Sequence, residues 1–272
     1  MDAYRHFVNQ YEDALSSVLP APNPDEFPKP PPPGPDAPVA LLFSPHPDDE
    51  VITGTLPLRL QHEAGARIVN IAVTLGSNPQ RRAARVRELE TACALLGWEL
   101  EIHGWTGLTA EAVDSTEPNP QNWLGSVVEI LQRWQPRWIF YPHADDWHPT
   151  HRAVNRLIEA ALKHVSLPAA PFRMQTEYWH PLAQPNLLVE CPPDHVALLI
   201  AALCCHQGEI ARNPYHLTLP AWMADNVRRG AEIVVGPGQP APEFKFGVLY
   251  RVEPGLPKGW DAVLAAKKST IK

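Results

Sequence analysis

The chain has 272 residues, of which 44% are hydrophobic and 19% charged, so it is long enough to bury one large core. Its formal net charge of −7 argues against a nucleic-acid-binding protein, because such a protein needs a broad cationic surface for phosphate contacts. This composition favours a small neutral or polar substrate.

The start of the chain and its cysteines indicate the compartment. Residues 1–19 lack the cationic region and apolar stretch of a secretory signal, and no apolar run is long enough to span a bilayer. The four cysteines show neither a CxxC spacing nor the density of a disulfide framework. We therefore expect a cytoplasmic protein with reduced thiols and no transmembrane segment.

Two segments precede the main domain. Residues 1–19 carry apolar side chains at steps of three and four, which predicts an amphipathic helix that packs onto another surface: Tyr4, Phe7, Val8, Tyr11, Leu15 and Val18. The ten prolines of residues 20–38 forbid a helix and favour an extended strap. A stiff connector is favoured over a ligand for an SH3-type domain. The sequence does not decide whether this helix covers its own domain or that of a neighbour, or whether the chain forms a homo-oligomer.

From residue 39 the pattern becomes strand, loop and helix, repeated, as in a parallel sheet with crossover helices. The predicted strands are 39–43, 67–74, 99–103 and 137–141. The predicted helices are 49–61, 80–96, 121–134 and 149–165, and Pro57 is expected to bend or shorten the first.

After residue 168 the alternation weakens. Strands are predicted at 174–179, 187–190 and 244–252, with a helix at 194–205. We therefore predict an α/β protein with a Rossmann-like, mostly parallel sheet flanked by helices and a smaller mixed C-terminal part. Residues 1–38 form the helix and strap, and residues 39–272 form one domain.

The segment Ser44-Pro45-His46-Pro47-Asp48-Asp49-Glu50 directly follows the first predicted strand. It puts an imidazole and three carboxylates at the carboxyl edge of the sheet, where open α/β folds bind ligands. His46 and Asp49 lie three residues apart and can converge on one ion, which suits zinc, iron or manganese. Adjacent aspartates rarely bind one metal from the same side, which leaves Asp48 free to move a proton. The alternative, an acidic helix start, is disfavoured by the flanking prolines.

A second cluster, His143-Ala144-Asp145-Asp146-Trp147-His148-Pro149-Thr150-His151, follows the predicted strand 137–141. Pro149 is suited to the first turn of a helix, so His148 and His151 flank that turn. One of them can ligate a metal while the other faces the reacting centre. With His46 and Asp49 this makes three ligands and leaves a coordination position open, as in catalytic zinc sites.

These residues resemble a known family. Pro45-His46-Pro47-Asp48-Asp49-Glu50 and His148-Pro149-Thr150-His151-Arg152-Ala153 resemble the two signatures of the LmbE-like/PIG-L family of metal-dependent de-N-acetylases. Between them, an RxxELxxAxxxLG helix is matched by Arg85, Glu88, Leu89, Ala92, Leu96 and Gly97. The resemblance covers about residues 39–165, with a weaker similarity at residues 203–207.

The resemblance implies a zinc-dependent hydrolase that removes the acetyl group of an N-acetylglucosamine-type amino sugar or its conjugate. It implies that His46, Asp49 and His151 bind Zn²⁺, with Fe²⁺ or Mn²⁺ as alternatives. Asp48 is then the general base for a zinc-activated water. His148 stabilises or protonates the tetrahedral intermediate.

Five further residues are assigned around this site. Asp146 can orient His148 or a metal ligand, and Glu50 begins the helix or supports the ligands. Arg85, Trp147 and His206 are candidates for contacts with substrate: Arg85 opens the family-like helix, Trp147 stands between site residues, and His206 lies in the later similar segment. The alternatives are a solvated helix face for Arg85, a core position for Trp147 and a helix cap for His206.

Two positions depart from the family pattern, and two other functions stay open. Thr150 stands where the family has an aspartate, and Leu75 stands where a polar residue is common. One alternative function is a metal-dependent amidase or esterase that acts on another acyl substrate. The other is a non-catalytic sugar-binding protein, which Asp48 argues against because binding alone needs no base.

Overall fold

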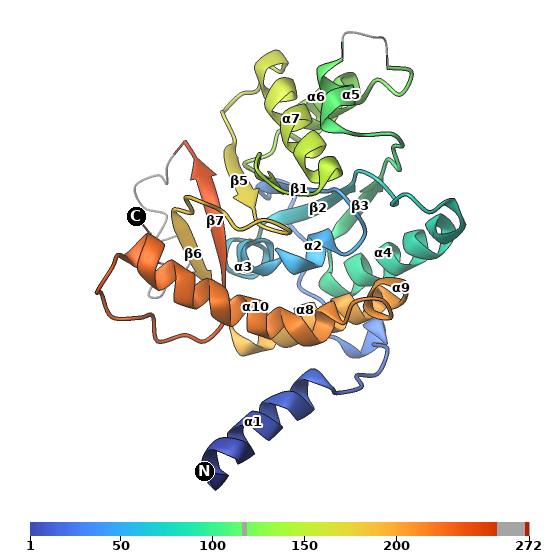
Figure 1. The fold of residues 1–272 in the computed structure, drawn as a ribbon. Coiled ribbons are helices and arrows are strands. Elements are labelled where there is room, and N and C mark those ends of the chain that lie inside the picture. The colour runs from blue at the N-terminus through green and yellow to red at the C-terminus, as the bar shows by residue number, and fades with distance from the viewer. Residues whose placement is uncertain (116–118, 255–269, 272) are drawn as a thin grey trace.

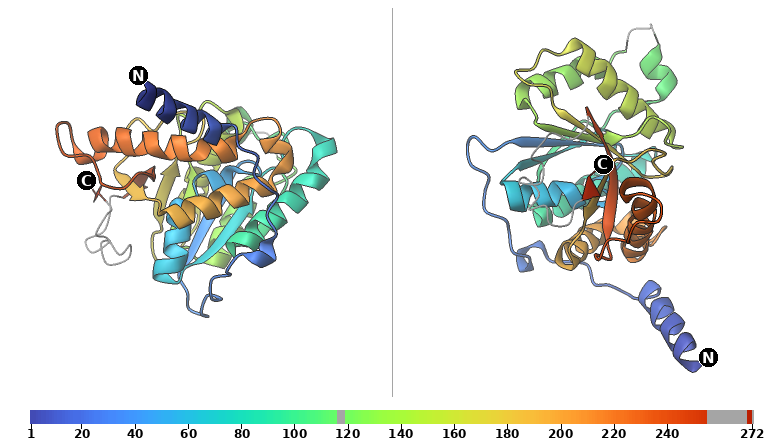
Figure 2. Two further views of the ribbon diagram at one scale, coloured as in Figure 1. Left: turned by 90° about the horizontal axis from the view of Figure 1, so that it is seen from below. Right: turned by 90° about the vertical axis from the view of Figure 1, so that its left-hand side faces the viewer.

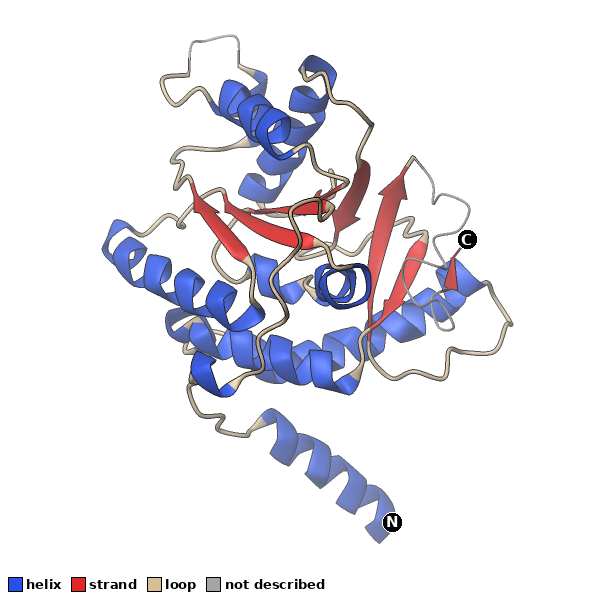
Figure 3. Cartoon of the chain, turned by 180° about the vertical axis from the view of Figure 1, so that it is seen from behind, coloured by secondary structure: helices blue, strands red, loops and turns tan. Residues whose placement is uncertain are grey.

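In the computed structural model, which describes residues 1–115, 119–254 and 270–271, one sheet of eight strands runs between two layers of helices (Figures 1 and 3). The strand order is β3-β2-β1-β4-β5-β7-β6-β8. The strands are β1 Val39–Ser44, β2 Arg67–Ala72, β3 Glu99–Ile102, β4 Trp138–Pro142, β5 Phe172–Thr176, β6 Leu187–Glu190, β7 Gly247–Glu253 and β8 Thr270–Ile271.

The strands from β3 to β5 in this order are parallel, whereas β7 pairs antiparallel with β5 and β6. The predicted α/β class with a mostly parallel sheet is therefore confirmed. Each of the seven predicted strands is present, and only β8 was not predicted. The largest difference between predicted and observed bounds is in β5, which was predicted at 174–179 and runs from Phe172 to Thr176. The chain leaves the sheet there after pairing with β4 and β7.

Helices cover both faces of the sheet, because strands such as β1 carry apolar side chains on both faces. Ala40 and Leu42 pack in the core on one face, and Leu41 and Phe43 pack in the core on the other. Figure 1 shows α5, α6 and α7 on one side and α3, α4, α8 and α10 on the other. The helices are α1 Asp2–Leu15, α2 Asp49–Ile52, α3 Thr55–Ala64, α4 Arg82–Leu96, α5 Ala110–Asp114, α6 Trp123–Trp134, α7 Pro149–His164, α8 Pro193–Cys205, α9 Gln207–Ile210 and α10 Tyr215–Gly230.

The helix predicted for residues 49–61 is two helices, because the chain breaks between α2 and α3 at Thr53 and Gly54. Pro57 lies in the first turn of α3, where its missing N–H costs little, so it does not bend a longer helix. The break is held by Tyr250 of β7, whose hydroxyl donates to the Thr53 carbonyl (2.7 Å) and accepts from the Leu56 N–H (3.0 Å).

Helix α10 was not predicted from the sequence, and Pro220 lies in its interior. A proline there removes one backbone hydrogen bond and disfavours a helix in isolation. Leu219, Met223 and Val227 recur every four residues and are buried, so tertiary packing outweighs this local cost.

The proline-rich strap is tied to the body of its own chain. Phe27 packs against the core, and Pro30 lies against Gly97 at the end of α4. Gly97 has a φ of +68°, and a Cβ there would come within 2.7 Å of Pro30, so only glycine suits both the helix end and the strap. These contacts favour the connector interpretation. Helix α1, in contrast, has no buried residue; it approaches α10 and otherwise extends away from the body (Figure 2).

Among the described residues, no helix combines the length and apolar character needed to cross a lipid bilayer. The cytoplasmic location stays a prediction from the sequence.

We expect Tyr250→Phe to lower the free energy of unfolding by about 1–3 kcal/mol, because the buried Thr53 carbonyl and Leu56 N–H would lose their shared partner. Urea denaturation measures this change. Tyr4→Phe is the control, since its hydroxyl lies on a side chain that is 74% exposed. Equal stability of the two variants would contradict the role assigned to Tyr250.

Candidate metal and active site

The two predicted clusters meet at one edge of the sheet. Strands β1 and β4 are parallel neighbours, with Leu42 opposite Phe140, so their carboxyl ends lie side by side. The chain passes from β1 to β2 and β3 on one side and then returns to β4 on the other. This reversal creates the crevice in which open α/β sheets bind ligands.

Three side-chain atoms form a nearly equilateral triangle at this edge. The Nδ1 of His46, the Oδ2 of Asp49 and the Nε2 of His151 are each 3.2 Å from the other two. Ligands that bind zinc tetrahedrally at its usual bond lengths are separated by about 3.3 Å. Two imidazoles and one carboxylate in this triangle therefore fit a divalent metal with an open position.

Asp146 supports His151 from behind. The ring of His151 is fully buried, and its Nδ1 lies 3.4 Å from the Oδ2 of Asp146. A proton on Nδ1 leaves the lone pair of Nε2 directed into the triangle, as in carboxylate–histidine–metal arrangements. Asp146 is itself fixed, because it accepts from the N–H groups of His148 (2.7 Å) and Trp179 (3.3 Å).

The triangle attracts positive charge. Burial lowers the pKa of His151, but the carboxylates of Asp49 and Asp146 outweigh it and raise that pKa to about 9. Burial alone would raise the pKa of Asp49, but His151 and His46 hold it well below its ordinary value. The Asp49 carboxylate also accepts from the His46 N–H (2.8 Å). Asp49 is therefore an anion at neutral pH, as a metal ligand must be.

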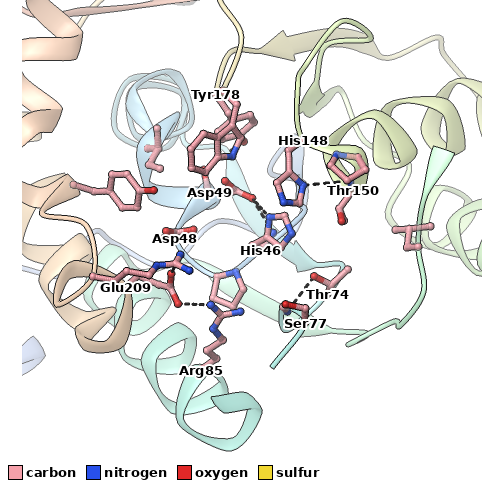
Figure 4. Close-up of a pocket in the computed structure, with 18 of the residues that line it drawn as sticks. His46, Asp48, Asp49, Thr74, Ser77, Arg85, His148, Thr150, Tyr178 and Glu209 are labelled. Carbon is pink, nitrogen blue, oxygen red and sulfur yellow. Dashed lines mark hydrogen bonds and ion pairs between the residues drawn. The ribbon is translucent and has the colours of Figure 1, made fainter. Parts of the chain in front are cut away.

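Asp48 has a backbone conformation that is rare for residues other than glycine. Its φ is 106° and its ψ is −29°, so this residue is strained. Its N–H donates to the Oε2 of Glu50 (3.0 Å), and the Oε1 of Glu50 lies 2.8 Å from the Nε2 of the fully buried His206. The Glu50–His206 pair thus holds the backbone of Asp48 in place. Figure 4 shows the result: Asp49 lies beside His46, and Asp48 lies on the side of Glu209 and Arg85.

The carboxyl group of Asp48 has a high affinity for protons. Burial, followed by the carboxylates of Asp49, Glu50 and Glu209, raises its pKa well above the ordinary value, and Arg85 opposes them. Arg85 lines the cavity as predicted, but its guanidinium already forms an ion pair with Glu209 and donates to the Leu75 carbonyl (3.0 Å). Arg85 is therefore placed to position Glu209 and the 75–77 loop as well as to contact a ligand.

His148 faces the same space as the triangle. It caps α7, where its Nδ1 accepts from the Thr150 N–H (3.3 Å), so the proton of the neutral ring is on Nε2. Burial and the imidazoles of His46 and His151 lower its pKa to about 4. His148 is thus a neutral hydrogen-bond donor near pH 7 rather than a cation. Its ring nitrogens approach those of His46 and His151 to within 4.8 Å.

A cavity of about 760 Å³ opens in front of these residues. Trp and Tyr side chains from several segments form part of its walls: Trp105, Tyr178, Trp179, Tyr215 and Trp222. Thr150, at the position that departs from the family pattern, also lines it (Figure 4).

Two residues predicted to contact substrate lie outside the cavity. Trp147 does not line the cavity; it is 67% exposed, and its ring packs on His180 at 5.1 Å. Trp179, by contrast, lines the cavity and stacks on His148 with ring centroids 6.4 Å apart. His206 is fully buried and acts on the site only through Glu50.

Sequence reasoning also missed Glu209, Tyr178, Trp179 and the residues of α10. Glu209 follows the weakly similar segment 203–207, which was the one available signal for it. The aromatic residues reach the cavity through long-range packing, which their sequence positions do not indicate.

Comparisons with known proteins agree with this geometry. Residues 41–162 match the family model for PIG-L, described as GlcNAc-PI de-N-acetylase. No curated protein matches the sequence. The family resemblance predicted from the sequence is thus confirmed over the segment that carries both clusters.

Three solved structures share the fold at low sequence identity. N,N′-diacetylchitobiose deacetylase from Pyrococcus horikoshii is 17% identical, with a TM-score of 0.60, and the match covers 91% of this chain and 93% of that one. A conserved protein from Thermus thermophilus is 20% identical, with a TM-score of 0.60 and coverages of 82% and 97%. The 4-carboxy-2-hydroxymuconate hydratase from Pseudomonas putida is 16% identical, with a TM-score of 0.63 and coverages of 82% and 99%.

Replacing Asp146 by Asn should weaken metal binding by about 10- to 100-fold, because His151 would lose the carboxylate that fixes its ring. Titration of the metal-free protein with Zn²⁺ measures this. Asp145→Asn is a matched control, since Asp145 is the exposed neighbouring carboxylate. Unchanged affinity in the Asp146 variant would show that His151 is held by packing alone.

Proposed function

We propose that this protein, whose residues 41–162 match the PIG-L family, is a zinc-dependent hydrolase that removes an acetyl group from an N-acetylated amino sugar or its conjugate. One observation carries the proposal: the triangle of His46, Asp49 and the fully buried His151 adjoins a large cavity, which is lined by His46, Asp49 and the carboxyl group of Asp48. The family match and the deacetylase among the structures that share the fold support it.

His46, Asp49 and His151 are the residues that would hold the metal. Two imidazole nitrogens and one carboxylate oxygen suit Zn²⁺, and Fe²⁺ or Mn²⁺ can also be bound by this set. When bound there, a divalent metal lowers the pKa of water and polarises an acyl carbonyl.

Asp48 is proposed to take a proton from the attacking water and to pass it to the amine that leaves. Burial and the neighbouring carboxylates raise the pKa of Asp48, which makes its carboxylate a stronger base toward a water proton. The rigid backbone at Asp48, fixed by Glu50, keeps its carboxyl group out of the metal triangle. This separates the base from the adjacent ligand Asp49.

His148 is proposed to donate a hydrogen bond from Nε2 to the acyl oxygen as negative charge develops on it. The Thr150 N–H fixes the tautomer and orients the ring. A neutral donor placed in advance stabilises such charge without reorganising in the transition state.

The cavity supports a substrate larger than one sugar. Its volume of about 760 Å³ is in the range of sites that bury drug-sized ligands. Trp179 and Trp222 offer aromatic surfaces on which the apolar face of a sugar ring or an aglycone can pack.

The fold alone does not set the reaction, since a hydratase shares it. The two alternatives, another acyl substrate or sugar binding without catalysis, are separated by supplying the protein with N-formyl, N-acetyl and N-butyryl glucosamine and the matching esters. Selective release of acetate supports the proposal. Binding of amino sugar without release of any acid would contradict it.

Removal of the metal with a chelator should abolish acetate release from N-acetylglucosamine conjugates, and added Zn²⁺ should restore it. An acetate assay on the stripped and reloaded protein measures both. Full activity of protein shown by metal analysis to be metal-free would rule out the mechanism.

Asp48→Asn should keep the metal but lower kcat by about 100- to 10,000-fold, because the amide cannot accept the proton. His151→Ala should lose the metal itself. Metal content and kcat measured on the same samples separate these two outcomes, with Asp145→Asn as the control. Loss of metal from the Asp48 variant would mean that Asp48 is a ligand rather than a base.

A further inference from the structure

Helix α1 carries an apolar face that its own chain leaves uncovered. Tyr4 is 74%, Phe7 70% and Tyr11 51% exposed. Among the described residues, eight of the twelve exposed large hydrophobic side chains lie in residues 1–19: Met1, Tyr4, Phe7, Val8, Tyr11, Leu15, Val18 and Leu19. We call Tyr4, Phe7, Val8, Tyr11 and Leu15 the aromatic face of α1.

This helix gains little support from the body. The strap is anchored by Phe27 and Pro30, and α1 extends beyond it, as the two views of Figure 2 show. A free helix of 14 residues is only marginally stable in water, and most helices gain their stability by packing an apolar face. The aromatic face therefore requires a partner.

We propose that this partner is α1 of a second copy of the chain, so that two protomers form a dimer through an antiparallel helix pair. The remaining exposed large hydrophobic side chains of the described residues are Ile102, Leu124, Trp147 and Trp179, which lie on separate elements and form no groove for α1. A twofold interface pairs one patch with itself, and the aromatic face is the exposed patch large enough to do so.

The charges on α1 favour the antiparallel orientation. The aromatic face carries no charged side chain, whereas Arg5 and Glu12 are seven residues apart and lie along the same edge of it. In an antiparallel pair with Phe7 opposite Tyr11 of the partner subunit, Arg5 lies next to Glu12 of the partner subunit. The twofold axis repeats both contacts, so opposite charges flank the interface on each helix.

The same charges disfavour a lipid surface. The side chains of Asp2, Glu12 and Asp13 outnumber that of Arg5 in α1, so the helix is acidic. Helices that lie on membranes are usually rich in Lys and Arg on the polar face, which attracts anionic lipids. A protein surface is therefore favoured over a membrane.

Sedimentation velocity of the full chain, over a range of concentrations, tests the proposal. The wild type should sediment with twice the protomer mass of 30.2 kDa. The double variant Phe7→Glu/Tyr11→Glu should halve that mass. His6→Glu/Asn9→Glu is the matched control, because both residues belong to α1 and lie opposite its aromatic face, so this variant should remain dimeric.

Substitutions of Arg5 and Glu12 test the antiparallel orientation of the two α1 helices. Arg5→Glu should weaken the dimer, and adding Glu12→Arg should restore it. A wild type that is monomeric at every concentration, or a Phe7→Glu/Tyr11→Glu variant that stays dimeric, would overturn the proposal. So would a monomer that co-sediments with vesicles of phosphatidylcholine and phosphatidylglycerol. All of these readouts are independent of acetate release, so they do not depend on the proposed function.

Discussion

The parallel pairing of β1 with β4 is the constraint on which the candidate site depends. It brings His46 and His151, which are 105 residues apart in sequence, to a nitrogen–nitrogen distance of 3.2 Å. Neither cluster holds enough ligands alone, and a shift in the register of one strand would separate them. The cores on both faces of β1 fix that register, so the stability of the sheet and the geometry of the site have a common origin.

Buried carboxylates that lie outside the cavity hold residues of the candidate site in place. Asp146 orients His151 from one side, and Glu50, braced by His206, holds Asp48 from the other. Each is buried, and burying a charge is costly unless it is paired. The left-handed backbone of Asp48 adds a further cost, which such a site retains because it keeps adjacent aspartates in separate places.

The sequence predicted what local pattern and motif determine. Apolar runs bounded by turns located the strands, and the spacing of His46, Asp49, His148 and His151 located the site. Local pattern failed where long-range packing decides: the helix around Pro220 persists because its other face is buried. It also could not tell that His206 points beneath the site, or that Trp179 rather than Trp147 faces the cavity, because neighbouring positions on a loop can point in opposite directions.

The residues proposed to react and one wall of the cavity come from different parts of the chain. His46, Asp48, Asp49, His148 and His151 all lie within residues 41–162, the range that matches the family. Tyr178, Trp179, Glu209, Tyr215 and Trp222 lie beyond it, on β5 to α10 and their connections. The two groups are linked, because the Trp179 N–H donates to Asp146 (3.3 Å) and the Tyr178 hydroxyl donates to the Asp49 carbonyl (3.3 Å). The cavity is therefore shaped by both segments, since Arg85, Trp105 and Thr150 line it from the first and Glu209, Tyr215 and Trp222 from the second.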